Sequence, residues 1–325
     1  MNPQRAAVIG AGTMGLGIAE CFALAGMDVL LIDAGPELSE LALKRLARRV
    51  RGHVDAGMLK PSALDKAAAV TTAKDLATAV ADAELVLEAV PENIEIKRDV
   101  LSACDRHAPP AAIIATNTSS LPIDKLAAFL DRDERFLGMH WFNPPEWTPA
   151  VEIIPSSRTD VAVVEQLRAF LLAIGKRPAT VGSAPGFVAN RIQFALFREA
   201  VACVAEGLAT PEELDELLRG SFGFRLPFYG PFQIADMAGL DVYESIFSVL
   251  ADGLGSDWEA PELLKRIVAE GRRGAKTLGG FYEYSAAQRE MMLLERDKRY
   301  AALNQLLGEL PPQNFTPRGA GDDQD

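Results

Sequence analysis

The chain contains 325 residues, of which 33 are basic and 45 acidic, and its formal net charge at pH 7 is −12. An apolar fraction of 49% and a charged fraction of 24% are typical of a globular protein and exclude a disordered chain, a collagen-like chain and a disulfide scaffold. The length predicts about two domains. The acidic total argues against nucleic acid as the main partner, because a phosphate backbone is bound by a basic surface.

The three cysteines, Cys21, Cys104 and Cys203, lie far apart and form no CxxC or Cys/His pair. We therefore expect no metal centre, and so small and odd a number indicates a reducing compartment. The uncharged stretch 6–19 is too short and too rich in glycine for a membrane span, and no signal peptide precedes it. These observations predict a cytoplasmic protein that binds no membrane.

Short apolar runs alternate with helical stretches up to about residue 184. The runs that we interpret as strands are 6–10, 28–33, 84–88, 112–116 and 135–141, and helical periodicity is clearest in 36–55, 94–106 and 160–174. Strands that are continuously apolar are expected where both faces of a parallel sheet are covered. The pattern predicts an α/β domain over residues 1–184, a Rossmann-type doubly wound sheet.

The pattern changes after Pro185-Gly186-Phe187. Apolar residues then recur at three- and four-residue spacing, and no strand-like run follows before 281–284. Thr210, Pro211 and Glu213 form a capping box that predicts a helix start. We expect an all-α domain over 185–309 and a disordered tail over 310–325, because the tail has few apolar residues.

A GxGxxG motif, formed by Gly10, Gly12 and Gly15, follows the first predicted strand and opens a predicted helix. In this context Gly10 permits a tight turn, Gly12 lets the backbone approach a pyrophosphate, and Gly15 allows the helix to pack closely on the strand. Asp33 closes the second strand, where a carboxylate accepts hydrogen bonds from a ribose diol and repels a 2′-phosphate. The motif predicts NAD rather than NADP; the alternative is a structural glycine turn with an unrelated aspartate.

Of the three histidines, His53 and His107 stand near predicted helix ends and are interpreted as solvated surface residues. His140 ends a late strand of the sheet, at the edge where α/β proteins bind ligands. Glu152 lies in a neighbouring strand-like segment twelve residues further on, so that the two strands can bring the carboxylate to the imidazole. A carboxylate partner fixes the ring tautomer of a general base. The alternatives are a structural histidine and a glutamate that faces water.

Two further polar residues have both a local and a catalytic interpretation. Ser119 is either the N-cap of a following helix, a role that Ser120 can also take, or part of the site. Asn190 is either a helix-start residue with only a local hydrogen bond or part of the site. The residues alone leave both alternatives open.

The sequence motifs together resemble the 3-hydroxyacyl-CoA dehydrogenase family over about residues 5 to 285. In order along the chain they are the glycine turn with Asp33, 88–97, 117–121, 138–144, 151–152, 185–191, 230–241 and 276–282. The resemblance implies NAD-dependent oxidation of the 3-hydroxyl of a short-chain L-3-hydroxyacyl-CoA to the 3-ketoacyl-CoA, a place in fatty acid metabolism, and a homodimer formed through the helical domain.

The resemblance also implies roles for individual residues. His140 and Glu152 match the catalytic pair, and Ser119 and Asn190 match the residues that hold the substrate oxygen. Residues that match the cofactor-binding positions are Gly10, Gly12, Gly15, Asp33, Glu92, Lys97, Ser119 and Asn143.

The identity of the substrate stays open at this stage. A basic cluster, Lys44, Arg45, Arg48, Arg49 and Arg51, suits the phosphates of CoA, and a solvated helix face is the alternative. Arg225, with Trp141 or Trp147 as a pocket wall, suits instead a small free hydroxy acid or a heteroaromatic alcohol carboxylate; packing between the domains is the alternative for the aromatic residues. A non-catalytic NAD-binding protein is the remaining hypothesis.

Overall fold

The structure is a computed structural model that describes residues 3–310. The predicted tail beyond Leu310 lies outside the described residues. The chain divides into two compact units, one up to Phe197 and one from Arg198 on, and each is described by itself. The domain boundary expected at 184/185 stays a prediction.

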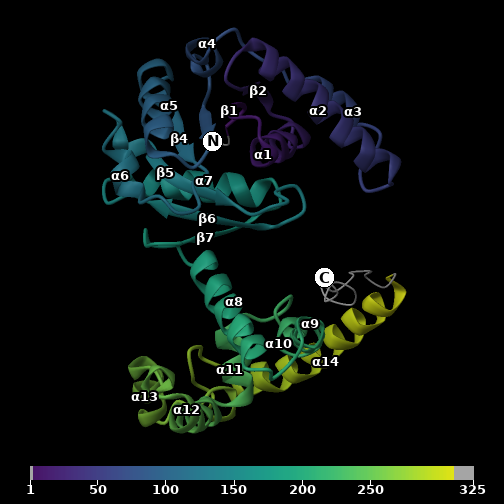
Figure 1. Ribbon diagram of the computed structural model, residues 1–325, viewed down its shortest axis with the longest axis vertical. Helices are drawn as coiled ribbons and strands as arrows, with labels where there is room; N and C mark the ends of the chain where they lie inside the picture. Colours follow the sequence, from purple (N-terminus) through teal and green to yellow (C-terminus); the bar gives the residue numbers. More distant parts are fainter. Residues whose placement is uncertain (1–2, 311–325) are drawn as a thin grey trace, which may run out of the picture. The chain divides into compact units, whose positions relative to one another are not determined.

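The first unit is built on one sheet whose strand order is β2-β1-β3-β4-β5-β6-β7 (Figure 1). Neighbouring strands are parallel except for β5 and β6, which are antiparallel. The strands are β1 (Arg5–Ile9), β2 (Asp28–Ile32), β3 (Leu85–Glu88), β4 (Ile113–Thr116), β5 (Phe136–Trp141), β6 (Ala150–Pro155) and β7 (Arg177–Thr180). Because β2 and β3 lie on opposite sides of β1, the strand order reverses there, which creates a ligand-binding crevice at the carboxyl ends of β1 and β3.

Helices cover both faces of this sheet. α1, α2, α3 and α7 bury their apolar residues in the core on one face, and α4, α5 and α6 bury theirs on the other. The helices are α1 (Thr13–Leu24), α2 (Pro36–Asp55), α3 (Ala63–Ala68), α4 (Leu76–Val80), α5 (Ile94–His107), α6 (Ile123–Ala127) and α7 (Val161–Ala173), with a 3₁₀ turn at Asp133–Arg135. The Rossmann-type doubly wound sheet predicted from sequence is confirmed. β7, α3 and α4 had not been predicted.

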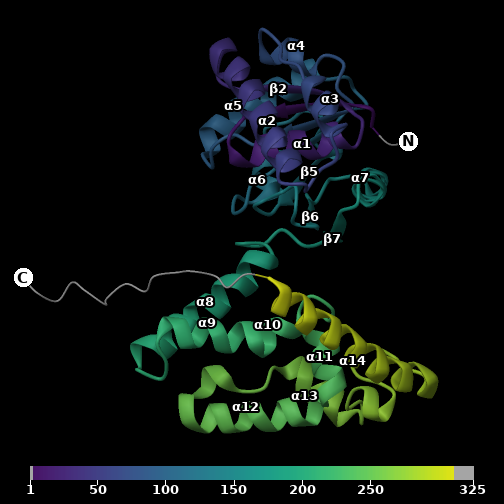
Figure 2. The same ribbon diagram turned by 90° about the vertical axis from the view of Figure 1, so that its right-hand side faces the viewer.

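Every regular element among the described residues of the second unit is a helix (Figure 2). Its elements are the end of α8 (Ala189–Ala205), α9 (Pro211–Gly220), α10 (Phe222–Arg225), α11 (Pro231–Ala238), α12 (Leu240–Leu254), α13 (Glu262–Ala269), α14 (Ala286–Glu309) and the 3₁₀ turns Ser256–Trp258 and Ala275–Thr277. The predicted capping box is present at the start of α9, where the Thr210 side chain accepts from the backbone N–H of Glu213.

The strand-like run 281–284 does not form a strand. The buried carboxylate of Asp236 instead accepts hydrogen bonds from the backbone N–H groups of Phe281 and Tyr282 and from the Tyr284 hydroxyl. Only an isolated bridge joins Gly279 to Glu283. The Asp236 side chain thus binds the backbone N–H groups that would otherwise pair with a neighbouring strand.

Candidate active site

The glycine turn between β1 and α1 is shaped for a bound pyrophosphate. Gly10 has a φ of +99°, and a Cβ on Gly15 would lie 1.8 Å from the carbonyl oxygen of Gly10, so neither position accepts a side chain. A Cβ on Gly12 would meet nothing within 4 Å. α1 has no side-chain cap and no acidic residue in its first turn, so its free N–H groups and dipole favour an anion. These features fit NAD.

Asp33 lies at the carboxyl end of β2, beside this turn. Its carboxylate accepts hydrogen bonds from the backbone N–H of Ala11 at 3.1 Å and of Ala34 at 2.7 Å. It also lines a cavity of about 560 Å³ whose walls include Ile9 and Ile32. A largely apolar cavity with the Asp33 carboxylate beside the glycine turn suits the adenosine half of a dinucleotide, with this carboxylate at the ribose diol.

His140 and Glu152 form a buried pair at the antiparallel junction of the sheet. They are direct partners in the register of β5 and β6, and His140 Nδ1 lies 2.8 Å from Glu152 Oε2. Both residues are buried, at 5% and 4% exposed. The other carboxylate oxygen, Oε1, accepts from the backbone N–H groups of Val188 and Ala189 at the start of α8. The pair therefore depends on strand register and on a helix start from a later part of the chain.

The environment of Glu152 keeps its carboxylate ionised. Burial on its own raises the pKa of Glu152, but the hydrogen bonds from His140 and from the backbone of Ala189 and Val188, together with the charge of His140, hold the pKa below its ordinary value of 4.5. An ionised carboxylate accepts a hydrogen bond and therefore favours the tautomer that carries the proton on Nδ1. The Nε2 atom of His140 is then the free acceptor of the ring.

His140 lines a pocket of about 510 Å³ together with Ser119, Asn190, Asn143 and Glu92. The Asn190 side chain donates to the backbone carbonyl of Ser119 at 3.3 Å. Four residues that the sequence assigns to substrate or cofactor thus line one pocket with His140. Glu152 lies behind the imidazole rather than in the pocket lining.

The N-cap interpretation of Ser119 and Ser120 is wrong. α6 begins at Ile123 with Pro122 as its N-cap and has no side-chain cap. The backbone N–H groups of both serines donate instead to Glu92 Oε1. Asn190 lies in the first turn of α8, as its local interpretation expected, but its side chain contacts a segment far away in the sequence.

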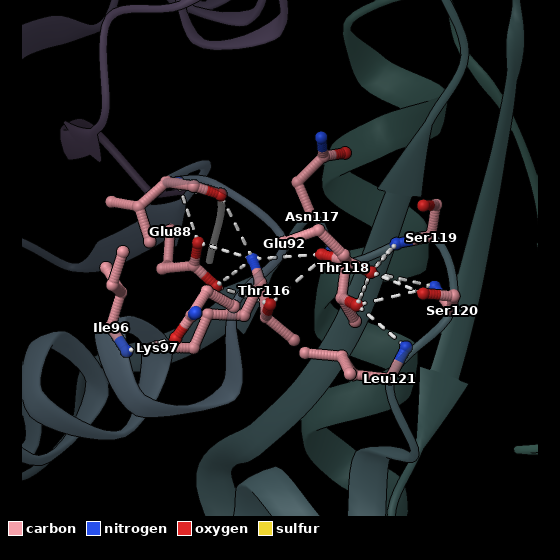
Figure 3. A network of polar contacts seen from close by, with 12 residues as sticks. Glu88, Glu92, Ile96, Lys97, Thr116, Asn117, Thr118, Ser119, Ser120 and Leu121 are labelled. Atoms are coloured by element: carbon pink, nitrogen blue, oxygen red, sulfur yellow. Dashed lines mark hydrogen bonds and ion pairs between the residues drawn. The ribbon is translucent and has the colours of Figure 1, made fainter.

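Glu92 and Lys97 belong to a polar network that the close-up view shows (Figure 3). The Lys97 ammonium lies 3.4 Å from Glu92 Oε2 and donates to both carboxylate oxygens of Glu88, at 2.7 and 3.0 Å. Lys97 is 1% exposed and Glu88 fully buried. Lys97 therefore lies behind the pocket wall, and its assignment to the cofactor stays a prediction.

Burial on its own also raises the pKa of Glu92. Hydrogen bonds from Thr118 and Ser120 and the charge of Lys97 outweigh burial and hold the pKa below its ordinary value of 4.5. Glu92 is therefore an anion at neutral pH.

Sequence reasoning had not assigned Asn117 and Glu88 to the site, although both stand in its motifs. The Asn117 side chain accepts from the backbone N–H of Trp141 at 2.9 Å and points away from the Glu92 network (Figure 3). Glu88 is the last residue of an otherwise apolar strand. A charged residue at the end of a buried strand is the signal that marks it, because a buried charge needs a partner.

The basic cluster on α2 is only partly available to a ligand. Arg49 pairs with Glu20 at 3.0 Å and with Glu146, whereas the other four basic residues of the cluster are exposed. The prediction that His53 is solvated is wrong. Its side chain is 15% exposed and its Nδ1 lies 2.8 Å from Glu20 Oε1. His107 is exposed as predicted.

The two tryptophans lie in different environments. Trp141 is 2% exposed and packs in the core against Phe22, with ring centroids 5.9 Å apart. Trp147 is 45% exposed and packs against His53, with ring centroids 5.3 Å apart. Trp141 therefore packs within the core of the first unit and also lines the pocket of His140, and packing of these aromatic residues between the domains stays a prediction.

The sheet topology, the glycine turn and Asp33 define a dinucleotide-binding α/β protein with a histidine–glutamate pair beside the nucleotide crevice. Residues 5–184 match the family model "3-hydroxyacyl-CoA dehydrogenase, NAD binding domain", and residues 186–284 match the model of the C-terminal domain of the same family. The chain belongs to the 3-hydroxyacyl-CoA dehydrogenase family. It is an oxidoreductase that acts on CH–OH groups, and its cofactor is NAD.

Individual relatives match nearly the whole chain. A 5-formyl-3-hydroxy-2-methylpyridine 4-carboxylate 5-dehydrogenase of Mesorhizobium japonicum is 38% identical over 93% of this chain and 97% of its own. A probable 3-hydroxybutyryl-CoA dehydrogenase of Bacillus subtilis is 36% identical over 87% and 98%. The crystal structure of a 3-hydroxyacyl-CoA dehydrogenase from Archaeoglobus fulgidus is 31% identical, with a TM-score of 0.78 over 94% of this chain and 99% of that chain.

Neither a metal centre nor a membrane span is found within residues 3–310. No three His, Cys, Asp or Glu side chains in this part of the chain are arranged to hold a metal ion. None of its helices has both the length and the apolar character needed to cross a bilayer.

Proposed function

We propose that the protein oxidises the 3-hydroxyl of a short-chain L-3-hydroxyacyl-CoA to the 3-ketoacyl-CoA. The observation that carries the proposal is the 2.8 Å contact between His140 Nδ1 and Glu152 Oε2, in a chain whose two parts both match this family. The four exposed basic residues of α2 suit the CoA phosphates.

The residues of the pocket have complementary tasks in this reaction. His140 Nε2 accepts the proton of the substrate hydroxyl, and Glu152 holds the ring in the required tautomer and stabilises the imidazolium that forms. The Ser119 hydroxyl and the second N–H of the Asn190 amide donate to the substrate oxygen. Bound NAD supplies the hydride acceptor.

The substrate is tested by measuring NADH formation with 3-hydroxybutyryl-CoA and with free 3-hydroxybutyrate. We expect kcat/KM to be higher for the thioester. Equal or better turnover of the free acid would overturn the CoA assignment.

A second candidate is a small free hydroxy acid or a heteroaromatic alcohol carboxylate. The observation that favours it is the 38% identity to a dehydrogenase named for a pyridine carboxylate. The sequence offers Arg225, on α10, as the guanidinium for a substrate carboxylate. Arg225→Met should then raise KM for the free acid selectively, whereas under the CoA hypothesis the preference for the thioester is unchanged.

The role of His140 is tested by the substitution His140→Ala. Loss of a general base lowers kcat by about 10²–10⁴-fold, and because the imidazole lies outside the adenosine cavity, the Kd for NAD should change little. A variant with near-parental kcat would show that another group accepts the proton.

We also propose that the protein is a cytoplasmic homodimer formed through its helical part. The support is apolar side chains left exposed on α12 and α14, among them Val249 at 69% and Met291 at 64%, since exposed apolar surface of this kind marks interfaces. Light scattering behind size exclusion should give about twice the chain mass of 35.0 kDa; a monomer at micromolar concentration would contradict the assignment.

A further inference from the structure

The segment between β4 and α6 carries Ser119 but has no regular structure of its own. A single oxygen atom, Glu92 Oε1, gathers its polar groups. This atom accepts from Thr118 Oγ1 at 2.5 Å, from the backbone N–H groups of Ser119 and Ser120 at 3.1 and 3.0 Å, and from Ser120 Oγ at 2.9 Å (Figure 3). Four donors from three consecutive residues thus share one acceptor atom. An ionised carboxylate binds so many donors better than a neutral group does.

The other side of the same carboxylate is held from the protein interior. Glu92 Oε2 faces the Lys97 ammonium at 3.4 Å. Lys97 is itself held by Glu88, which also accepts from the Thr116 hydroxyl at 2.6 Å and from the backbone N–H of Val90 at 2.7 Å. Lys97 and Glu88 are 1% and 0% exposed, and the ammonium donates to both Glu88 oxygens and to the Val90 carbonyl oxygen. A buried ammonium with these partners is a fixed charge opposite Glu92 Oε2.

The Ser119 peptide is held at both ends by side chains. Its N–H donates to Glu92, and its carbonyl oxygen accepts from the Asn190 amide at 3.3 Å. Within residues 3–310 the hydrogen bonds of Ser119 are made by its backbone and none by its hydroxyl, which lines the same pocket as His140. A shift of this peptide would therefore move both proposed donors to the substrate oxygen together.

We propose that Glu92 is a positioning residue that holds the Ser119 hydroxyl and the Asn190 amide in register with His140, and that Lys97 and Glu88 fix its carboxylate. This inference rests on the proposed oxidation of a hydroxy substrate. It differs from a role of Glu92 in holding the cofactor, because Glu92 acts here through Ser119 and Asn190. A misplacement of about 1 Å at such a site costs about 10²-fold in rate.

The substitution Glu92→Gln separates the two roles. The amide keeps the size of the side chain but loses the charge that attracts four donors and the Lys97 ammonium. We expect kcat at saturating NAD and substrate to fall by about 10²-fold, with the Kd for NAD within threefold of the parent. A rise in the Kd for NAD at unchanged kcat would assign Glu92 to the cofactor and overturn the inference.

A double-mutant cycle tests whether Glu92 acts through Ser119. The rate of hydride transfer is measured in a single turnover for the parent, Glu92→Gln, Ser119→Ala and the double variant. Once the Ser119 hydroxyl is absent, its position no longer matters. Glu92→Gln should therefore slow hydride transfer much less in the Ser119→Ala background than it does in the parent. Fully multiplicative losses would contradict the inference.

Two further variants separate a specific effect of Glu92 from a general effect on folding. Glu95→Gln changes an exposed carboxylate in the first turn of the same helix, α5, and should leave every readout unchanged. Ser120→Ala removes one hydrogen-bond donor to Glu92 from an exposed position. We expect it to lower kcat by less than Glu92→Gln does, and it tests the inference even if Glu92→Gln folds poorly. A parent-like kcat in both cluster variants would overturn the inference.

A readout independent of turnover is the hydrogen exchange of the backbone N–H groups of residues 118–121. Loss of the carboxylate should remove protection in this segment, and Glu95→Gln should not. If the parent oxidises no hydroxy substrate, the proposed function fails while this measurement still reports whether Glu92 holds the segment. Unchanged protection in Glu92→Gln would show that it does not.

Discussion

Replacement of Glu152 by glutamine is the perturbation whose outcome follows most directly from the structure. The carboxylate uses one oxygen for His140 Nδ1 and the other for two backbone N–H groups at the start of α8. In Glu152→Gln the amide oxygen can still accept from Val188 and Ala189. The amide nitrogen then faces Nδ1, and since it can only donate, it favours the tautomer that carries the proton on Nε2.

The expected loss is that of a general base in the wrong tautomer. A positioned base contributes about 10²–10⁴-fold, so kcat should fall by this factor, which corresponds to about 3–5 kcal/mol of transition-state stabilisation. The loss of a hydrogen bond to a charged group costs about 1.5–3 kcal/mol of folding free energy, so the variant should still fold.

The assay is the initial rate of NADH formation at saturating substrate and NAD, with the Kd for NAD measured separately by fluorescence. Glu165→Gln changes an exposed glutamate of α7 and serves as the matched control. A Glu152→Gln variant that keeps kcat within threefold of the parent would refute the assignment of Glu152 as the group that orients His140.

Three further outcomes can be measured. Because the native structure lowers the pKa of Glu152 below 4.5, its ionised form stabilises the fold above that pH, and the advantage in unfolding free energy over Glu152→Gln should shrink as pH falls from 5 to 3; a constant difference in urea titrations would contradict this. Asp33→Ala removes the carboxylate beside the adenosine cavity, so the ratio of kcat/KM for NAD over NADP should decrease, and a parent that already prefers NADP would refute the reasoning. Burial raises the pKa of Cys104 to about 12, so native protein at pH 8 should give no Cys104 adduct with iodoacetamide by mass spectrometry, whereas urea-unfolded protein should; alkylation of the native thiol would contradict its burial.

Local sequence patterns were sufficient for the elements whose structure depends on near neighbours. The glycine turn, the apolar strands and the capping box at Thr210 are each set within a few residues, because a positive φ, continuous burial or a side-chain cap needs no distant partner. The short strand β7 was missed because its residues Arg177–Thr180 include a proline and are not strongly apolar. It pairs at the edge of the sheet, where these residues are tolerated.

The sequence predicted the candidate residues, but only the fold shows which groups surround them. Sequence spacing brought out His140 and Glu152, but the antiparallel register of β5 and β6 makes them direct neighbours. The sequence around His53 is typical of a surface residue, but Glu20 of α1 lies beside its ring in the structure. The N-cap interpretation of Ser119 failed because α6 begins only at Ile123 with Pro122 as its N-cap; the N–H group of Ser119 is bound by Glu92, 27 positions away.

The sequence alone determined the family, the NAD turn and the residue types of the pocket, since these depend on short motifs and on alternating apolar runs. The tertiary structure decided which charges are buried, what they bind and how Ser119 is held. The physical reason is that a charge in the interior must find a partner wherever the fold places one, and the partners of Lys97, Glu92 and Glu152 come from other elements of the chain.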